Sequence, residues 1–550
     1  MTAIITNKFR IRSAKDFIEN VVGHPRMNPL TNLLNITGTT QDELSVSLAE
    51  TYGSHAVDRN MYVFIGKSLN WDNDLIPPVP TDDIVSLVDV RENILGLKLV
   101  DNLGGSLVIP RFNWDATGIT IYKQFDNTDP DLLTDMDHPH YCITDEYHVF
   151  KCLGNNGGSV STIRPERPAT APFIHYASDG YVWKYMTTVN GYQADRFLTD
   201  RWIPVKKLLE NDGSIQWQVQ QAAETSTGMI ESCIIENAGD GYNALVSEII
   251  GGAGTTYQLL DGSALANVYA GSILYLLDGS GQSREIIAYD EVTKTVTLVD
   301  SLNMNPGDQI EIMPKITVTG NGSLVNIKAN VETTGINQGK LTSVSILNAG
   351  EEYTYASIVV SGGAPTINAE IRPIVSAVYG HGSDIEKELG AFFAMLNIKL
   401  QFDEGGGDFP LSNDYRQIGL IRDLKDYNTE ELATISTRRA IRRMHLSSVA
   451  GTFVGDEVIS GTSGTETMVG YVVDFDSNTN ILSYLQNSDS GMTLFTAGMN
   501  ISSASGSASI SSIDNPECDI YSGELLYYEN RRPVLRSPDQ IEDIKIVVEF

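Results

Sequence analysis

Hydrophobic and polar residues alternate in short runs along most of this chain. The runs are rich in Val, Ile, Thr and Tyr, and Gly, Asn and Asp separate them. β-branched and aromatic residues favour strands, whereas Gly, Asn and Asp favour the turns between strands. The pattern predicts a mainly β, multidomain protein with several sandwich-like or barrel-like modules and a few short helices.

Three segments have apolar residues at helical spacing. Ser13 is placed to cap a short helix with Phe17 and Val21 on one face. Ser383 and Glu386 have the form of a capping box, in which each side chain satisfies a backbone donor at a helix start. A third helix is predicted to begin near Thr429. The apolar positions that support the second and third helices are Ile385, Leu389, Phe392 and Leu396, and then Leu432, Ile435 and Ile441.

The chain contains an internal repeat. Residues 232–242 match residues 343–353, since each is a run of strand-forming residues that ends in Asn-Ala-Gly with a Tyr three residues after the Gly. A weaker similarity links residues 271–314 with residues 449–510, each with a predicted hairpin. Such recurrence indicates related β-modules, and we interpret the second pair as small sandwiches or barrels.

Changes in composition suggest five segments. Residues 1–212 are rich in Trp, Pro and Tyr, and residues 213–365 are rich in Gly, Thr and Val. Residues 366–445 hold the two stronger helix predictions, residues 446–513 are rich in Ser and Gly, and residues 514–550 form a distinct C-terminal segment.

Acidity limits the choice of partners. The 550 residues include 38 Lys and Arg against 70 Asp and Glu, a formal net charge of −32. This charge argues against nucleic acid or an anionic membrane as the main partner. The sequence has no apolar run of membrane-spanning length and no signal-peptide pattern, so we expect no membrane association and no signal-dependent secretion. Four cysteines are too few for a disulfide framework.

One acidic stretch resembles a calcium-binding loop by spacing. Asp129, Asp131, Asp135 and Asp137 fall at positions 1, 3, 7 and 9 of the loop. Position 6 is Thr134 where Gly is required, and position 12 is His140 where Glu is required. We therefore prefer a solvated acidic loop to a calcium site.

The following residues include ligand types that zinc prefers, namely His138, His140, Cys142, His148 and Cys152. No closely spaced Cys pair is present, and the alternation of the first three also fits one face of a strand. We expect Cys152 to pack in a core. No metal or cofactor is predicted.

Sequence signatures of catalysis are missing. The chain has no nucleophile elbow, phosphate loop, zinc-protease motif or dinucleotide fingerprint. The many Asp and Glu residues are compatible with a catalytic carboxylate pair of the glycosidase type. Their number alone is not evidence for such a pair. We expect a protein that is not an enzyme.

Four arginines follow the start of the third predicted helix. Arg438 and Arg442, like Arg439 and Arg443, are four residues apart and would share a helix face. This local positive charge could dock an acidic neighbour or a second copy of the chain. A solvated face with internal salt bridges is an equally good interpretation.

A predicted strand at residues 62–71 leads into a segment with aromatic and proline residues. Trp71 is followed by Pro77, Pro78 and Pro80 and by the acidic pair at 82–83. Such a surface can bind a partner. It can equally be a loop packed on its own domain.

Several blocks of residues stand out along the chain, namely residues 3–10, Phe64–Lys67 with Trp71, Pro77–Asp82, Ile109–Asp115, Tyr147–Leu153, Asp179–Tyr185, Tyr415–Ile421, Tyr528–Val534, Asp539–Gln540 and Glu549–Phe550. In the same order, these blocks resemble the dimeric β-rich baseplate wedge protein of T-even-type contractile-tailed phages. Residues 3–10 are similar to that family's first strand, and the most specific similarities are Asp-Gly-Tyr-Val-Trp and an ending of the form Glu-Asn-Arg-x-Pro.

The resemblance covers roughly residues 1–210, 366–427 and 515–550. It implies that residues 213–365 and 446–513 are insertions and that residues 514–550 rejoin the core. It also implies a structural virion protein, assembled in the host cytoplasm, that forms a homodimer and bridges neighbouring wedge subunits as the tail contracts.

We expect subunit contacts in the segments around Trp71 and residues 527–538. The candidate partner-binding residues are Trp71, Pro78, Pro80, Tyr528, Arg531, Arg532, Arg438 and Arg442. The same two segments could instead tie the ends of one domain together. An alternative function is a tail protein that binds a host-surface receptor or glycan through the inserted modules. A tail-associated glycan hydrolase is the least favoured alternative.

Overall fold

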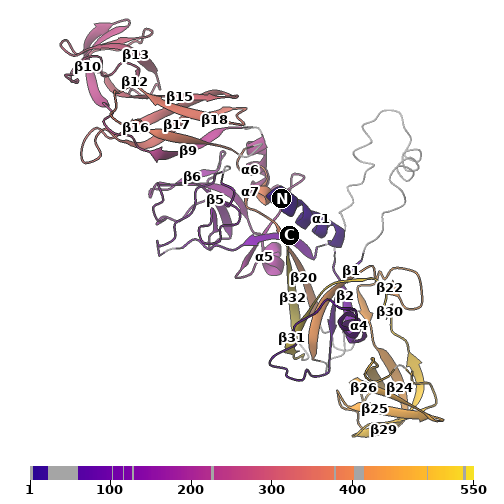
Figure 1. The fold of residues 1–550 in the computed structure, drawn as a ribbon. Helices are drawn as coiled ribbons and strands as arrows, with labels where there is room; N and C mark the ends of the chain where they lie inside the picture. Colours follow the sequence, from indigo (N-terminus) through magenta and orange to yellow (C-terminus); the bar gives the residue numbers. More distant parts are fainter. Residues whose placement is uncertain are drawn as a thin grey trace, which may run out of the picture. The chain divides into compact units, whose positions relative to one another are not determined.

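The computed structural model describes residues 4–22, 60–401 and 414–550, apart from positions 102, 116, 127–128, 225–227, 377–379, 492 and 537–539. Within these residues the chain is mainly β, as predicted, with several sheets and a few short helices (Figure 1). It divides into two compact units. Unit 1 comprises residues 1–108, 195–197 and 391–550, and unit 2 comprises residues 109–194 and 198–390. The predictions on Ala3, Pro538 and Asp539 lie outside the described residues.

Unit 1 is built on a five-stranded sheet with the order β23-β2-β1-β21-β31. Strand β20 pairs along nine residues with β32 and also pairs with the start of β3. Buried aliphatic side chains of β1, β20, β21 and β32 form one core cluster. The strands outside the barrel are β1 (Met61–Gly66), β2 (Ile94–Leu99), β3 (Gly105–Pro110), β20 (Phe393–Gln401), β21 (Tyr415–Arg422), β22 (Lys425–Asp426), β23 (Thr437–Arg439), β30 (Cys518–Asp519), β31 (Glu524–Val534) and β32 (Ile541–Glu549).

Two helices belong to unit 1, α1 (Asn7–Val22) and α4 (Ile84–Glu92). The predicted helix with Phe17 and Val21 on its packed face is confirmed, but Ser13 is inside α1 and does not cap it. Residues 7–10, which the resemblance places in an opening strand, are helical in this chain. The helix is tied to the C-terminus by Arg10, which contacts Glu549 at 2.7 Å and lies over the Phe392 ring.

The helix predicted from Thr429 to Ile441 is wrong. Thr437–Arg439 is strand β23, which pairs with β2, and β24 begins at Arg442. Strand pairing to β2 overrides the helical spacing of the apolar residues, as tertiary contacts often do.

Residues 442–514 form a closed six-stranded barrel with the strand order β24-β27-β26-β25-β28-β29. Its interior holds Met, Phe, Tyr and aliphatic side chains. The strands are β24 (Arg442–Gly451), β25 (Val458–Ser463), β26 (Glu466–Asp476), β27 (Ile481–Leu485), β28 (Asn500–Ser502) and β29 (Gly506–Asp514).

Unit 2 contains a four-stranded sheet with the order β4-β5-β7-β6 and an aromatic core. Cys152 is fully buried there, as expected. The elements outside the inserted modules are β4 (Tyr141–Ile143), β5 (His148–Asn155), β6 (Ile174–Tyr176), β7 (Tyr181–Thr188), β8 (Trp202–Val205), α6 (Ile215–Glu224) and α7 (Ile385–Glu388). Helix α5 (Gly191–Phe197) begins in unit 2, and its last three residues belong to unit 1.

Helix α7 is much shorter than predicted. The cap is Asp384, whose side chain accepts from the Lys387 amide, so the capping box of Ser383 and Glu386 is wrong. Gly390 has a φ of +73°, and strand β20 begins soon after it. Pairing of β20 on both edges explains why the apolar run up to Leu396 is not helical.

The repeat at residues 232–242 and 343–353 is a repeat in structure. In each copy the Asn side chain accepts from the backbone N–H of the Gly (Asn237 to Gly239, 2.9 Å; Asn348 to Gly350, 3.0 Å). Each Gly has a positive φ, and the Tyr that follows is buried. The strands of this sandwich are β9 (Ile230–Asn237), β15 (Gln309–Gly320), β16 (Ser323–Val331), β17 (Leu341–Glu351), β18 (Ala356–Ser361) and β19 (Glu370–Val375).

The two copies of this repeat are joined by equivalent backbone hydrogen bonds in both directions. The Tyr242 amide donates to the oxygen of Gly339, which precedes β17, and the Tyr353 amide donates to the oxygen of Gly228, which precedes β9. Strand β9 pairs with β19, which follows the second copy, and β17 pairs with β16, which follows the first. The sandwich is therefore a duplicated unit with exchanged strands.

A second barrel is inserted between the first repeat and its continuation. It consists of β10 (Leu245–Ala253), β11 (Thr256–Leu259), β12 (Ser272–Leu276), β13 (Ser283–Asp290), β14 (Thr295–Leu298) and β15. Its pairings form the ring β10-β11-β14-β13-β12-β15, closed by β15 and β10.

The two barrels are circular permutations of one ring. If β10 is matched to β29, and β11 to β15 are matched in order to β24 to β28, every pairing of one barrel has its equivalent in the other. The matching hairpins agree in detail, because Lys294 and Asn480 both follow an Asp-x-x-Thr turn and have φ values of +54° and +56°. The weaker sequence similarity therefore marks a shared architecture.

Candidate partner-binding surface

The loop from Trp71 to Asp83 lies on strand β31 of unit 1. The Trp71 indole N–H donates to the oxygen of Arg531 at 3.0 Å, and the Asn530 amide donates to the oxygen of Pro78 at 2.9 Å. The Tyr528 hydroxyl accepts from the Thr81 amide at 2.8 Å and lies 2.7 Å from the Thr81 oxygen. The two segments named in the sequence are thus in contact within one chain.

Arg416 holds the start of this loop in place. Its side chain is almost completely buried, and its guanidinium donates two hydrogen bonds to the Asp74 carboxylate, at 3.0 and 3.1 Å. It also contacts the Ser68 oxygen and the Asn70 side chain. The bond from Arg416 is the main reason that the pKa of Asp74 is lowered. This bidentate pairing restricts the loop geometrically.

Asp83 closes the loop and caps helix α4. Its carboxylate accepts from the Ser86 amide at 3.0 Å and from the hydroxyls of Ser86 and Thr81 at 2.7 Å. These bonds, led by the one from the Ser86 amide, lower the pKa of Asp83 to about 2. A charged N-cap suits the positive end of the helix.

The loop and the first turn of α4 expose large apolar side chains. Val79, Ile84 and Val85 are 84%, 81% and 79% exposed, and Leu75 and Ile76 are about as exposed as these. We call these five residues the apolar rim. Exposed single apolar residues are ordinary, but a group on a loop that hydrogen bonds hold in place is typical of a binding surface.

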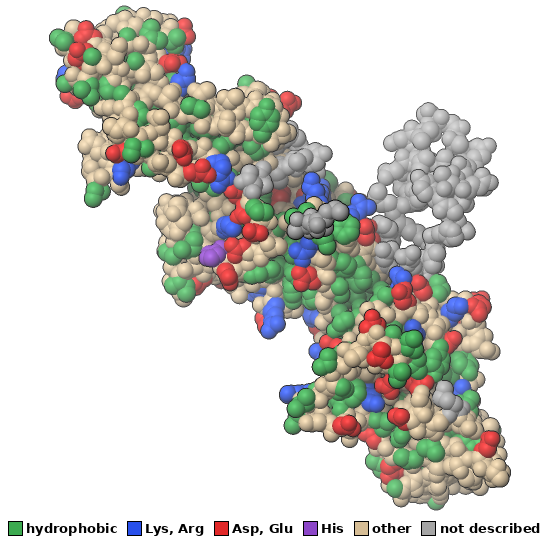
Figure 2. All heavy atoms as spheres, viewed as in Figure 1, with side chains coloured by type: hydrophobic (Ala, Val, Ile, Leu, Met, Phe, Trp, Pro, Cys, Tyr) green, Lys and Arg blue, Asp and Glu red, His purple; other side chains and the backbone are tan. Residues whose placement is uncertain are grey.

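A groove of about 590 Å³ lies beside the rim. The loop, helix α4 and strand β31 line it, together with the barrel residues Ser488 and Asp489. Figure 2 shows apolar and acidic side chains next to each other over the part of the surface where Figure 1 draws α4. We call this hollow the α4 groove.

Three of the predicted residues, Trp71, Pro78 and Tyr528, line the α4 groove together. Pro80 is exposed on the same loop. Arg531 contacts the loop through its backbone oxygen, while its side chain pairs with Glu529 at 2.8 Å. Arg532 donates to the Leu75 oxygen at 3.0 Å.

Arg438 and Arg442 lie away from this groove. Arg438 is buried and pairs with Asp426 at 2.7 Å, so its charge is already neutralised within the chain. Arg442 donates to Asn515 at 2.6 Å and lies near the Tyr427 ring. These contacts agree with the alternative in which the arginines form pairs within the chain. Arg438 and Arg442 do not share a helix face, because the predicted helix does not form.

Some residues of the site were not predicted. Ile84 and Val85 follow the Pro-rich block directly and are the first two residues of helix α4 after its cap, Asp83. Ser488 and Asp489 belong to a segment whose only sequence signal was a bias toward Ser and Gly. Arg416 lies in the block Tyr415–Ile421 of the resemblance. An Arg between strand-forming residues was the signal that could have identified it.

Side chains that the sequence offered as metal ligands make other contacts in the structure. Lys123 lies 2.6 Å from Asp129 and 3.3 Å from Asp135, so a lysine satisfies the acidic loop. His140 is buried and bonds to the Glu388 oxygen at 3.0 Å, and burial lowers its pKa to about 4. Among the described residues no group of three or more His, Cys, Asp or Glu is arranged to hold a metal ion. Within the same residues no helix is long and apolar enough to span a membrane.

No protein-family model matches this chain, and the search of curated proteins found no match to it.

Proposed function

We propose that this protein is a structural subunit of the baseplate wedge of a contractile phage tail, which binds neighbouring wedge subunits and forms a homodimer. The observation that carries the proposal is a convergence of blocks. Four blocks of the resemblance, around Trp71, Pro78, Arg416 and Asn530, come from three distant parts of the chain and meet at one loop. These blocks together form and support the loop that carries the apolar rim.

The physical properties of this loop suit docking. Its backbone is held by Arg416, Asp83 and strand β31, so little conformational entropy is lost when a partner covers it. Its apolar side chains supply area that is stabilising only when it is buried. The strong negative charge keeps the unassembled subunit soluble until the partner is present.

The experiment is assembly with a disrupted rim. The double variant V79D/V85D places two charges on the rim without touching the bonds that hold the loop. We expect folded protein but a large loss of complete tails, measured by sedimentation and electron microscopy of particles made with the variant.

The matched control is V292D/I336D, which changes two side chains of similar exposure in unit 2. We expect normal assembly from it. Normal assembly of V79D/V85D would contradict the proposed role of the loop.

A further inference from the structure

We propose that the α4 groove binds a segment of a partner protein that carries Lys or Arg next to apolar residues. This inference rests on the proposed function, since it names the kind of surface that the neighbouring subunit must present. The occupant is thus a protein segment of stated charge, and neither an acidic segment nor a second copy of this groove fits it.

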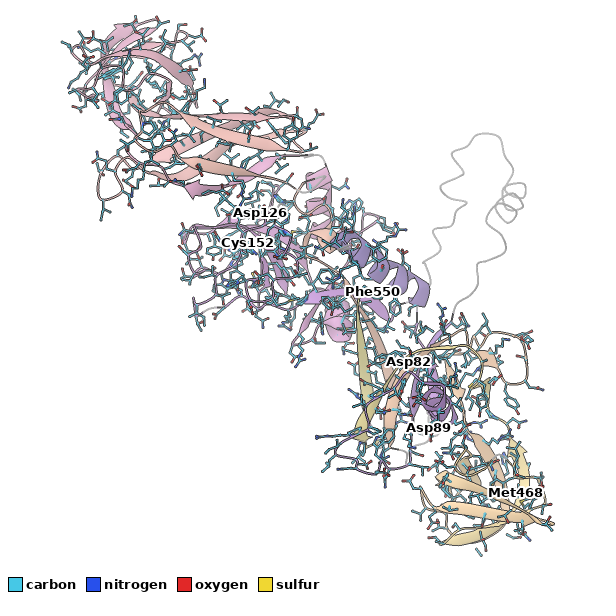
Figure 3. All side chains as sticks on the ribbon, in the orientation of Figure 1. Asp82, Asp89, Asp126, Cys152, Met468 and Phe550 are labelled. Carbon is cyan, nitrogen blue, oxygen red and sulfur yellow. The ribbon has the colours of Figure 1, made fainter. Side chains whose placement is uncertain are left out.

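The ionisable side chains that line the groove are acidic. Among the described lining residues Asp89 and Asp489 are charged, and none is Lys, Arg or His. Asp82, near the end of the loop, is exposed. Figure 3 marks Asp82 just before helix α4 and Asp89 within the helix. The groove therefore combines an apolar rim with negative charge.

Two nearby arginines, Arg91 and Arg532, are used to hold the structure together. Arg91 donates to the backbone oxygens of Ile520, Ser522 and Gly523 at 2.7 to 2.9 Å. Arg532 is bound to the loop backbone. Asp89 accepts from Asn93 of its own helix at 3.0 Å, and no ion pair to Asp89 or Asp489 is found in the described part of the chain. A cation on the partner would supply this missing pair.

The acidic wall contributed by the barrel is fixed to the core of unit 1. The buried carboxylate of Glu92 accepts from the Ser488 amide at 2.8 Å, from its hydroxyl at 2.6 Å, and from the Tyr521 hydroxyl at 3.0 Å. Asp489 is the next residue, so its position relative to α4 is set by these bonds. The barrel of residues 442–514 thus helps to select the partner.

Charge complementarity excludes the other occupants. An acidic segment would meet Asp89 and Asp489 at close range, and two copies of the groove placed face to face would oppose like charges. A segment with basic and apolar residues covers the rim and neutralises the wall at once.

The test is photocrosslinking from the groove during assembly. A photo-reactive phenylalanine replaces Val85 in the full chain, and the crosslinked peptides from assembled tails are identified by mass spectrometry. A second position, Ile336, serves as the control site in unit 2. We expect one partner segment at position 85, with a net positive charge and apolar residues, and no such segment at position 336.

Charge is then tested separately from apolar contact. In D89N/D489N the crosslink from position 85 should fall at least tenfold. In D131N/D137N, which removes two exposed acidic charges of unit 2, the crosslink should be unchanged.

Each other outcome contradicts a distinct claim. A neutral or acidic segment at position 85, or a crosslink that D89N/D489N leaves intact, overturns the charge inference while the docking role of the loop stands. Complete tails with no crosslink from position 85 overturn the docking role of the loop itself.

Discussion

The Trp71 indole N–H donates to the backbone oxygen of Arg531 at 3.0 Å, although 460 positions separate the two residues. The bond joins the loop that follows β1 to strand β31 near the C-terminus. It makes the geometry of the apolar rim depend on both ends of the chain.

Replacing Trp71 with Phe keeps an aromatic ring near Lys67 but removes the donor. One lost hydrogen bond is worth about 1 kcal/mol, so local opening of the loop should become about five-fold more frequent. Hydrogen exchange of residues 72–83, followed by mass spectrometry, measures this change. Trp217→Phe, in helix α6 of unit 2, should leave the loop unaffected. Equal exchange in wild type and Trp71→Phe would show that the bond does not hold the loop.

The cap at Asp83 predicts a specific response to acid. Since folding lowers the pKa of Asp83 to about 2, the contribution of its charge is complete above the ordinary value of 3.8 and is lost as the pH falls through about 2. The carboxyl carbon of Asp83 should therefore titrate near pH 2 in an NMR experiment on the native chain. Ser86→Ala removes a hydroxyl donor and should raise that pKa. Titration of Asp83 near 3.8 in the wild type would contradict the cap.

The duplicated sandwich predicts that Gly239 and Gly350 are equivalent. Both have positive φ values, and a Cβ at either position would lie under 3 Å from the ring of the following Tyr. Gly239→Ala and Gly350→Ala should each destabilise the sandwich by about 1–3 kcal/mol. Gly335 also has a positive φ but open space around it, so Gly335→Ala should cost less. Denaturant unfolding of the full chain, followed by hydrogen exchange in the sandwich, compares the three variants. A similar cost at all three positions would contradict the role of the Tyr ring.

Unit 2 contains a buried ion pair between Lys151 and Glu388. Both side chains are almost fully buried, and the carboxylate also accepts from the amides of Gly382 and Asp384. Glu388→Gln removes the charge that Lys151 contacts and should destabilise unit 2 by about 3–5 kcal/mol. The double variant K151M/E388Q should lose less, because no buried lysine charge remains. Thermal unfolding of the full chain measures both, and an equal or larger loss in the double variant would count against this pair.

The sequence was sufficient for the fold class and for the position of the loop. Alternation of β-branched residues with turn residues depends on local chemistry, which the structure follows in both barrels and in the sandwich. The Asn-Ala-Gly repeats were visible because the turn uses the Asn side chain as an acceptor and a Gly with a positive φ. The circular permutation was not, since strand order around a ring is set by pairing between distant segments.

The failures have a common physical cause. The segments after Thr429 and after Glu388 do not form the predicted helices, because β23 and β20 have pairing partners in β2, β3 and β32 that no local pattern reveals. The candidate site was only partly predicted for the same reason. Trp71, Pro78 and Tyr528 could be named from their residue types. Asp489 could not, because its place in the groove depends on the hydrogen bonds between Glu92 and the neighbouring Ser488.

The most direct test of the central claim is to locate the chain in the particle. Antibody against this protein would be bound to intact virions and imaged by electron microscopy. The proposed function predicts label at the baseplate, at the end of a contractile tail. Label at fibre tips would instead indicate adhesion to the host, and particles without label, with the protein present only in the lysate, would contradict a structural role.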